Sequence, residues 1–137
     1  GNANPTAFIM ANNTFQAVST IGYPESRILL SQCAIYLATS PKSNASYMAI
    51  GNAQQLVKET GDLPVPIPLR NAPTKLMKEL GYGDEYKYSH DYANNFAEQE
   101  FLPDTISGTA FYVPGNNSRE NGTREFLKNR WKDKYGY

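Results

Sequence analysis

Apolar residues in the first sixty positions recur at helical spacing. A helix is predicted over residues 4–22, with Asn4-Pro5 as its start, a glycine as its stop and one apolar stripe formed by Phe8, Ala11, Phe15 and Val18. Two further helices are predicted, from about residue 25 to 39 and from about 43 to 60. Short connections favour antiparallel neighbours, so residues 4–60 are expected to form a compact helical bundle.

The second of these helices is apolar on nearly all sides, through Ile28, Leu29, Cys33, Ile35, Tyr36 and Leu37. A helix of this kind is central, packed against several neighbours or against another subunit. In so small a domain, it has more apolar surface than its neighbours can cover. We therefore expect a subunit interface on the first two helices, with five candidate residues: Phe8, Phe15, Ile28, Leu29 and Tyr36.

The second half of the chain has less periodicity. The prolines of "LPVPIPL" (63–69) predict an extended segment that cannot lie inside a sheet. A short helix is predicted from an N-cap at Asn71 to a stop at Gly81, with a buried side formed by Leu76, Met77 and Leu80. Residues 82–104 are expected to form a long ordered loop.

The last third is predicted to contain one short strand, "TAFYV" (109–113), then a linker, "PGNNSRENG", and a basic helix from about Thr123. The predicted fold class is therefore all-α: a helical bundle with a long ordered loop and a short strand segment. Two parts are expected, a helical domain at 1–114 and a linker with the basic helix at 115–137.

Composition narrows the possible functions. The formal net charge is zero and the pI is about 6.8, so any basic surface must be local. One cysteine permits no intrachain disulfide, and a zinc site, which needs several His or Cys ligands, is not expected from one residue of each. There is no GxxxxGK[ST] loop, no strand–GxGxxG–helix unit and no apolar run long enough to span a bilayer. The opening "GNANPTAF", without an initiator Met, predicts a piece of a longer protein.

Three long blocks of the chain resemble a known family: "GYPESRILLSQCAIYLATSPKSNASYMAI", "PVPIPLRNAPTKLMKELGYGDEYKYSHDY" and "QEFLPDTISGTAFYVP". They are similar to the C-terminal region of the RarA/MgsA family, replication-associated AAA+ ATPases related to clamp-loader subunits and to the Werner-helicase-interacting ATPase. The resemblance runs from about Asn2 to Pro114. The stretches that carry most of it are "PKSN" (41–44), "LRNAPTKLMKELGYG" (69–83) and "FLPD" (101–104).

The resemblance implies a non-catalytic, clamp-loader-collar-like domain that assembles ATPase subunits, largely into tetramers. It also implies association with DNA at stalled or gapped forks, replication proteins as possible partners, and a cytoplasmic, nucleoid-associated location away from membranes. The Walker motifs, the sensor residues and the arginine finger would lie outside these residues. No cofactor is therefore expected in this chain, and ATP and Mg²⁺ are expected in the ATPase core.

Two potentially reactive sites are better explained by structural roles than by catalysis. His90-Asp91 resembles an acid–base pair, but no nucleophile motif accompanies it, so an anchoring role in the loop is favoured over catalysis by a small hydrolase. Cys33 lies within an apolar helix, where a thiol behaves as a small hydrophobic residue.

A basic and aromatic stretch is the main rival to assembly. Its cations could pair with phosphates while neighbouring tyrosines stack on unpaired bases, and the candidate DNA contacts are Arg70, Lys75, Lys78 and Lys87. Nearby acidic residues favour the alternative of a solvated surface. The C-terminal helix, with six Lys/Arg against three Asp/Glu from Arg119 to Tyr137, is a further possible DNA contact. A DNA-binding module thus remains the alternative to an assembly domain.

Overall fold

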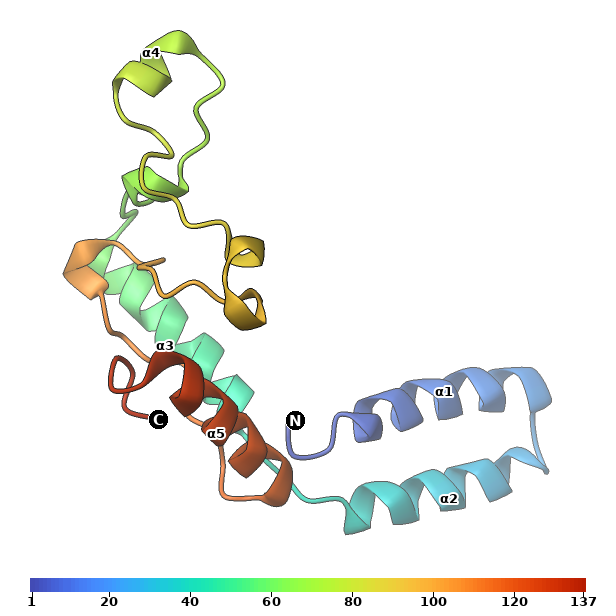
Figure 1. Cartoon of the computed structure of the whole chain (residues 1–137). Coiled ribbons are helices and arrows are strands. Elements are labelled where there is room, and N and C mark those ends of the chain that lie inside the picture. The colour runs from blue at the N-terminus through green and yellow to red at the C-terminus, as the bar shows by residue number, and fades with distance from the viewer. The chain divides into compact units, whose positions relative to one another are not determined.

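The computed structural model describes all residues from 1 to 137 and consists of helices, turns and irregular segments without a β-strand (Figure 1). The predicted all-α class is confirmed. The strand predicted at 109–113 is wrong, because this segment has no regular secondary structure. A strand needs a partner for its backbone hydrogen bonds, and the chain supplies none.

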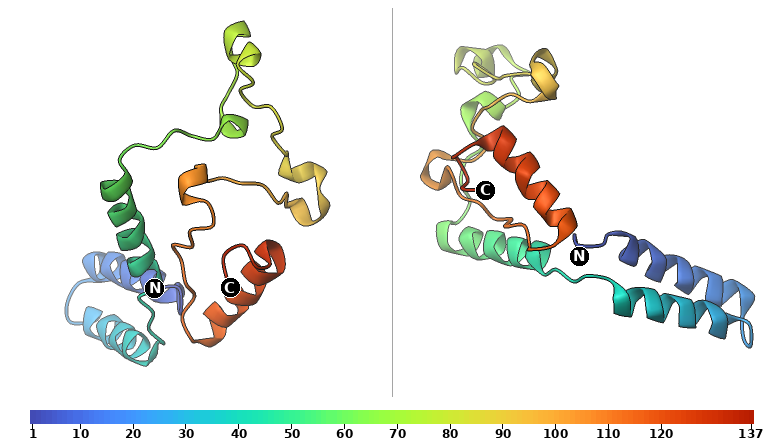
Figure 2. Two further views of the ribbon diagram at one scale, coloured as in Figure 1. Left: turned by 90° about the vertical axis from the view of Figure 1, so that its left-hand side faces the viewer. Right: turned by 60° about the horizontal axis from the view of Figure 1, so that its bottom comes forward.

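The helices follow the chain in a simple order, which two further views make visible (Figure 2). The α-helices are α1 (Thr6–Ile21), α2 (Ser26–Thr39), α3 (Ala45–Thr60), α4 (Lys75–Glu79) and α5 (Ser118–Trp131). Single 3-10 turns lie between them: η1 (Ile67–Leu69), η2 (Ser89–Asp91), η3 (Ala93–Asn95) and η4 (Asp104–Ile106). The first three α-helices agree with the predicted ranges to within two residues.

The chain forms two compact units. The first comprises residues 1–51 and 112–125, and the second comprises 52–111 and 126–137. Helices α3 and α5 each contribute their first part to one unit and their last part to the other. The predicted division at residue 114 concerned a family domain and its tail, and it stays a prediction.

In the first unit, α1 and α2 lie side by side in antiparallel directions (Figure 1). The predicted glycine stop is confirmed: Gly22 has φ 76°, and its N–H donates to the carbonyl of Val18 at 3.0 Å. The predicted side-chain cap by Asn4 is wrong, because its amide donates instead to the Tyr36 hydroxyl at 3.2 Å and to Ser40 Oγ at 2.9 Å. Asn4 thus ties the start of α1 to the end of α2.

The predicted bundle of three helices over residues 4–60 is reduced to this pair. Helix α3 makes no helix–helix contact with α1 or α2. Its second half belongs to the other compact unit, so it is not available as the third helix of a bundle.

In the second unit, residues 61–66 have no regular structure, as expected from their prolines, and η1 follows. The N-cap of α4 is Thr74, whose Oγ1 accepts the N–H of Met77 at 3.3 Å, and not Asn71. A cap bonds to the third helical residue, and Thr74 has the extended backbone that this geometry requires. The predicted buried side of α4 is also wrong, since Leu76 and Leu80 are exposed.

The long loop predicted over 82–104 contains only 3-10 turns and irregular structure, and it is held by the C-terminal segment within the second unit. Helix α5 begins at Ser118, five residues before the predicted start, so most of the predicted linker is helical. No helix of the chain is long and apolar enough to cross a membrane.

Candidate subunit interface

The seam between α1 and α2 is built from small and medium side chains. The buried or half-buried positions of α2 are spaced alternately by three and four residues: Ser26, Leu29, Cys33, Tyr36 and Ser40. Those of α1 follow the same spacing at Ala7, Met10, Thr14 and Ala17. This is the a/d pattern of an antiparallel helical pair, and it buries the seam at close interhelical distance.

The two phenylalanines of α1 and most of the large aliphatic residues of α2 point away from this seam. Phe8 is 79% exposed and Phe15 is 69% exposed, although both are apolar. On α2, four aliphatic residues are also exposed: Ile28, Leu30, Ile35 and Leu37. Contiguous exposed apolar surface on a helix marks a surface that binds a partner, whereas scattered exposed residues do not.

The exposed residues fall on two faces, because residues seven apart share one side of a helix. Both phenylalanines of α1 directly follow a seam position, and so do Leu30 and Leu37 of α2. In an antiparallel pair, residues that directly follow a seam position lie on the same side of the two helices, so the two leucines share a side with the phenylalanines. We call this the phenylalanine face: Phe8, Phe15, Leu30 and Leu37. The opposite side, the isoleucine face, carries Ile9, Ile28 and Ile35.

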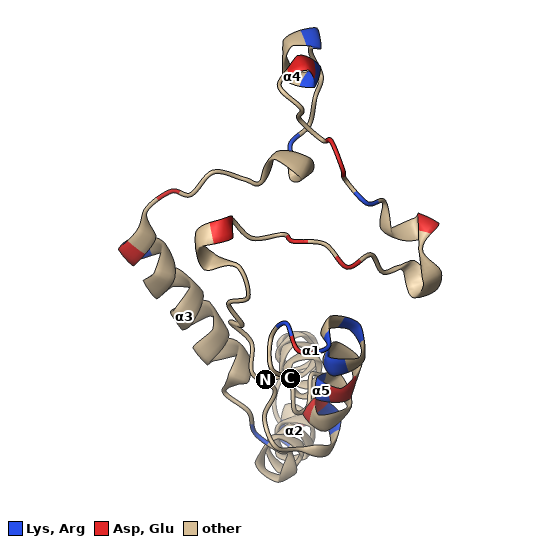
Figure 3. Cartoon of the chain, turned by 60° about the vertical axis from the view of Figure 1, so that its left-hand side comes forward, with Lys and Arg blue, Asp and Glu red and all other residues tan.

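The hairpin is almost without charge. Helix α1 contains no charged residue and α2 contains only Arg27, so both are drawn almost entirely tan in Figure 3. Helix α5, in contrast, carries many charged residues. A surface that remains in water normally carries charges that keep it soluble and monomeric, and the hairpin carries only Arg27, at one end of the phenylalanine face.

Of the five predicted interface residues, Phe8, Phe15 and Ile28 are exposed on these faces, while Leu29 and Tyr36 are half-buried in the seam. On α2, sequence reasoning did not single out three further exposed residues as interface candidates: Leu30, Ile35 and Leu37. Their signal is the repeat of seven residues, 28/35 and 30/37, on either side of the seam positions. Cys33 is buried in the seam, as expected of a small hydrophobic residue.

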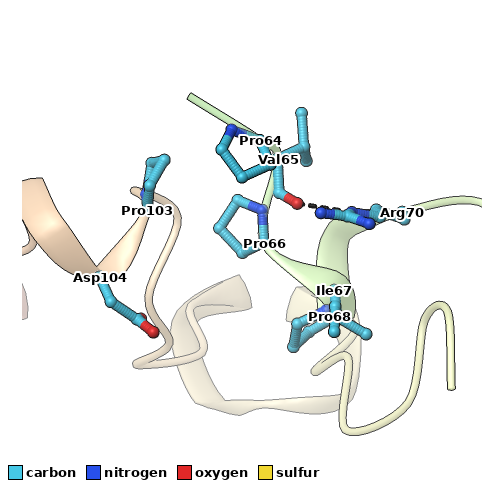
Figure 4. A pocket seen from close by; sticks show the side chains of 8 residues that line it. All are labelled: Pro64, Val65, Pro66, Ile67, Pro68, Arg70, Pro103 and Asp104. Atoms are coloured by element: carbon cyan, nitrogen blue, oxygen red, sulfur yellow. Dashed lines mark hydrogen bonds between the residues drawn. The ribbon is translucent and has the colours of Figure 1, made fainter. Parts of the chain in front are cut away.

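The four predicted DNA contacts lie in the second unit, and two of them bind within the chain. Arg70 donates to the Val65 carbonyl at 2.6 Å and to the Tyr82 hydroxyl at 3.1 Å, with its guanidinium 5.0 Å from the centre of the Tyr82 ring. Figure 4 shows the bond to Val65 beside the proline-rich segment. Lys87 donates to the carbonyl of Glu98 at 3.2 Å. These two cations therefore organise the loop.

The other two predicted DNA contacts are on α4. Lys75 forms an exposed ion pair with Glu79 at 3.8 Å, and Lys78 is exposed without a hydrogen bond or ion pair. The four residues thus do not form one free basic surface. His90 lies in η2 with its ring 5.1 Å from that of Tyr88, a packing contact consistent with an anchoring role.

One buried carboxylate was not identified from the sequence. Glu120, fully buried on α5, accepts hydrogen bonds from the Tyr112 hydroxyl at 2.8 Å and the Asn117 amide at 2.5 Å. Burial opposes its ionisation, but hydrogen bonds from Ser43, Asn117, Tyr112 and the Gly115 amide outweigh burial and lower the pKa of Glu120 to about 2. The sequence contains a helix-start pattern at this point, an Asn followed three residues later by a Glu. The Asn117 side chain caps the helix by accepting the Glu120 N–H at 3.0 Å.

Comparison with known proteins places the chain in a family. Residues 1–131 match the family described as "MgsA AAA+ ATPase C terminal". The chain belongs to the MgsA AAA+ ATPase C-terminal family. The match extends beyond the predicted limit near residue 114 and includes all of α5.

Relatives of this MgsA C-terminal domain carry informative names. The chain is 44% identical over 128 residues to "Replication-associated recombination protein A" of Escherichia coli strain K12, covering 93% of the chain and 29% of that protein. The namesake of Coxiella burnetii is 41% identical over 129 residues, with the same coverage. "ATPase WRNIP1" of Dictyostelium discoideum is 38% identical over 113 residues, covering 82% of the chain and 13% of that protein. The chain thus spans less than a third of these relatives, and the predicted RarA/MgsA resemblance is confirmed.

Proposed function

We propose that this domain holds together the subunits of an AAA+ ATPase, with the α1–α2 hairpin as the contact surface. The observation that carries the proposal is the exposure of apolar residues on a hairpin with almost no charge. Burying a Phe, Leu or Ile side chain contributes roughly 1.5–3 kcal/mol. A neighbouring subunit that covered even a few of these residues would therefore bind with useful affinity, after the cost of association is met.

The two faces of the hairpin suggest more than one neighbour per subunit. A dimer with a single two-fold contact would cover one face and leave the other in water. Both the phenylalanine face and the isoleucine face carry exposed apolar residues. This supports a homo-oligomer larger than a dimer, with a tetramer as the expected state.

For the whole protein, we propose a DNA-dependent ATPase that acts in replication, recombination and repair at stalled forks. The names of the relatives, with replication-associated recombination in two of the three, support this proposal. ATP and Mg²⁺ would be held by an ATPase core outside these residues, and DNA and replication proteins would be its partners in the cytoplasm, at the nucleoid. The chain itself would contribute assembly and no catalysis.

Light scattering after size-exclusion chromatography tests the assembly role. We expect a mass several times the 15.3 kDa of one chain at high micromolar concentration. Phe15→Glu, which places a charge on the phenylalanine face, should give the monomer. The matched control is Gln54→Glu, which adds the same charge at an exposed polar position of α3, outside the hairpin, and should leave the mass unchanged. A monomeric parent chain, or an equal effect of both variants, would contradict the proposal.

DNA binding is the second candidate, and the observation that favours it is Lys78, a cation without a partner in the chain. Fluorescence anisotropy with single-stranded and forked DNA separates this role from assembly. If phosphates are bound, the affinity should fall steeply with salt, and Lys78→Ala should reduce the slope. Absence of binding at low salt would eliminate this candidate.

A further inference from the structure

The second unit contains an apolar groove without an occupant. It has a volume of about 550 Å³ and runs between the C-terminal half of α3 and residues 102–111. Its walls include Leu56 and Val57 of α3, together with Leu63, Ile106 and Phe111. Val57 is 59% exposed, so the groove is open to solvent. Concave apolar surface of this size is typical of sites that receive side chains of a partner.

The rim of this groove is acidic. Asp62 lines it directly. Asp104 lines the adjoining hollow, which shares Pro103 with the groove (Figure 4). Both aspartates are exposed and neither forms an ion pair. The one cation at this hollow, Arg70, already binds the Val65 carbonyl. An apolar occupant with a positive charge would therefore complement the groove.

Helix α4 has the opposite character. Leu76 and Leu80 are one turn apart on one side of the helix and are 63% and 56% exposed. The same segment carries Lys75 and Lys78 against a single glutamate, so its charge is positive. It is held in place at both ends, by the Thr74 cap before it and by the Arg70–Tyr82 bond after it. It therefore presents two leucines on a preformed, basic helix.

We propose that α4 of one copy of this chain docks in the groove of a second copy. Leu76 and Leu80 would enter the apolar groove, and Lys75 would lie near the acidic rim formed by Asp62 and Asp104. Within one copy the leucines and the groove are both open to solvent, so neither satisfies the other. The contact is head-to-tail, since the two surfaces differ, and such contacts build closed rings or chains of subunits.

This inference rests on the proposed assembly role but uses a surface separate from the hairpin. It also gives a different purpose to Lys75, which sequence reasoning assigned to DNA. A leucine pair on a short helix entering an apolar groove is a common mode of helix recognition. The charges would set the register and orientation of the contact more than its strength.

Cysteine crosslinking between two different copies tests the docking. Val57→Cys is made in one sample of the chain and Leu80→Cys in the other, and the two are mixed and oxidised. We expect a crosslinked dimer from the mixture at least tenfold faster than from either variant alone. The controls are the parent chain, whose only thiol, Cys33, is buried, and Lys78→Cys, which replaces Leu80→Cys on the opposite side of α4. Equal rates for the mixture and the controls would overturn the proposal.

Charge reversal then tests the register. Asp62→Lys with Asp104→Lys in the Val57→Cys copy should slow the crosslink, as should Lys75→Glu in the Leu80→Cys copy. The two reversed copies together should recover it. A single chain carrying both cysteines that closes only on itself would show internal docking and refute the proposal. If crosslinking fails while Phe15→Glu still dissociates the assembly, this inference is wrong and the proposed function stands.

Discussion

The α1–α2 hairpin and the C-terminal segment differ in their aromatic residues, which are exposed in the hairpin and packed against other rings in the C-terminal segment. In the C-terminal segment, Trp131 lies edge-on to Phe96 and Tyr135, with ring centres 4.9 and 5.1 Å apart. The lysines that follow pair with loop carboxylates, Lys132 with Glu98 at 3.1 Å and Lys134 with Glu100 at 2.9 Å. In the hairpin, the two phenylalanines are exposed and α1 itself carries no charged residue.

This difference separates a surface completed by its own chain from one that lacks a partner. Aromatic rings packed against each other and flanked by paired charges contribute stability without further help. Exposed phenylalanines on an uncharged helix contribute stability only when something covers them. The hairpin and the C-terminal segment should therefore respond to substitution in different measurements, the first in association and the second in unfolding.

The largest effect is expected from charges on the two faces of the hairpin. Leu37→Asp on the phenylalanine face and Ile35→Asp on the isoleucine face each place an unpaired charge where we propose a buried contact. Such a charge costs about 3–5 kcal/mol, more than a hundredfold in affinity. Light scattering should find smaller species for both variants while circular dichroism shows the helices intact.

The comparison of these two variants decides how many faces are used. Gln54→Glu, at an exposed polar position of α3 outside the hairpin, is the control and should assemble normally. If Ile35→Asp assembles as well as the control while Leu37→Asp does not, a single face is used and the expected tetramer is wrong.

The next largest effect concerns the C-terminal segment. Trp131→Ala removes a ring that contacts Phe96, Phe101 and Tyr135. Loss of a large aromatic side chain from such a cluster costs about 3 kcal/mol in the free energy of unfolding. Urea denaturation should show this loss, with the assembled mass unchanged in native buffer. A change in mass without a change in unfolding would mean that this cluster is an interface and not a completed core.

Much of the hairpin was predictable because its signals are local. Helix periodicity and the stop at Gly22 set the ends of α1 without reference to the rest of the chain. The choice of buried side was not predictable, because α1 and α2 are apolar on several sides. The seam contains small residues such as Ala7 and Ala17, which permit close approach of the helices, and the phenylalanines are exposed.

The C-terminal part was harder to predict because its structure depends on distant partners. Residues 118–122 include a glycine and an asparagine and resemble a linker, but the Asn117 cap makes them helical. Residues 109–113 have strand-forming composition, but no second strand exists to pair with them. Local sequence preference determines the secondary structure of a segment only where no long-range contact competes with it.

The smallest effect concerns two carboxylates, one in each compact unit. Burial opposes ionisation of Glu100 as well, but hydrogen bonds from Ser107 and Leu102 and the charge of Lys134 lower its pKa to about 2, as found for Glu120. Both values lie below the ordinary 4.5, so each carboxylate stabilises the folded state above about pH 4.5. This stability is lost as the pH falls through 4.5 toward 2.

Glu120→Gln and Glu100→Gln distinguish a carboxylate held by neutral hydrogen-bond donors from one paired with a charged lysine. Glu120 accepts only from neutral donors, so the effect of its replacement, about 1–2 kcal/mol at neutral pH, should not change with salt. Glu100 is paired with Lys134, so the effect of its replacement should shrink at about 0.5 M salt. Urea midpoints at neutral pH and near pH 3 measure both, and each variant should lose less stability in acid than the parent chain. An unchanged acid dependence in Glu120→Gln would mean that the pKa of Glu120 is the same in the folded and the unfolded chain, so that its neutral donors do not stabilise the negative charge.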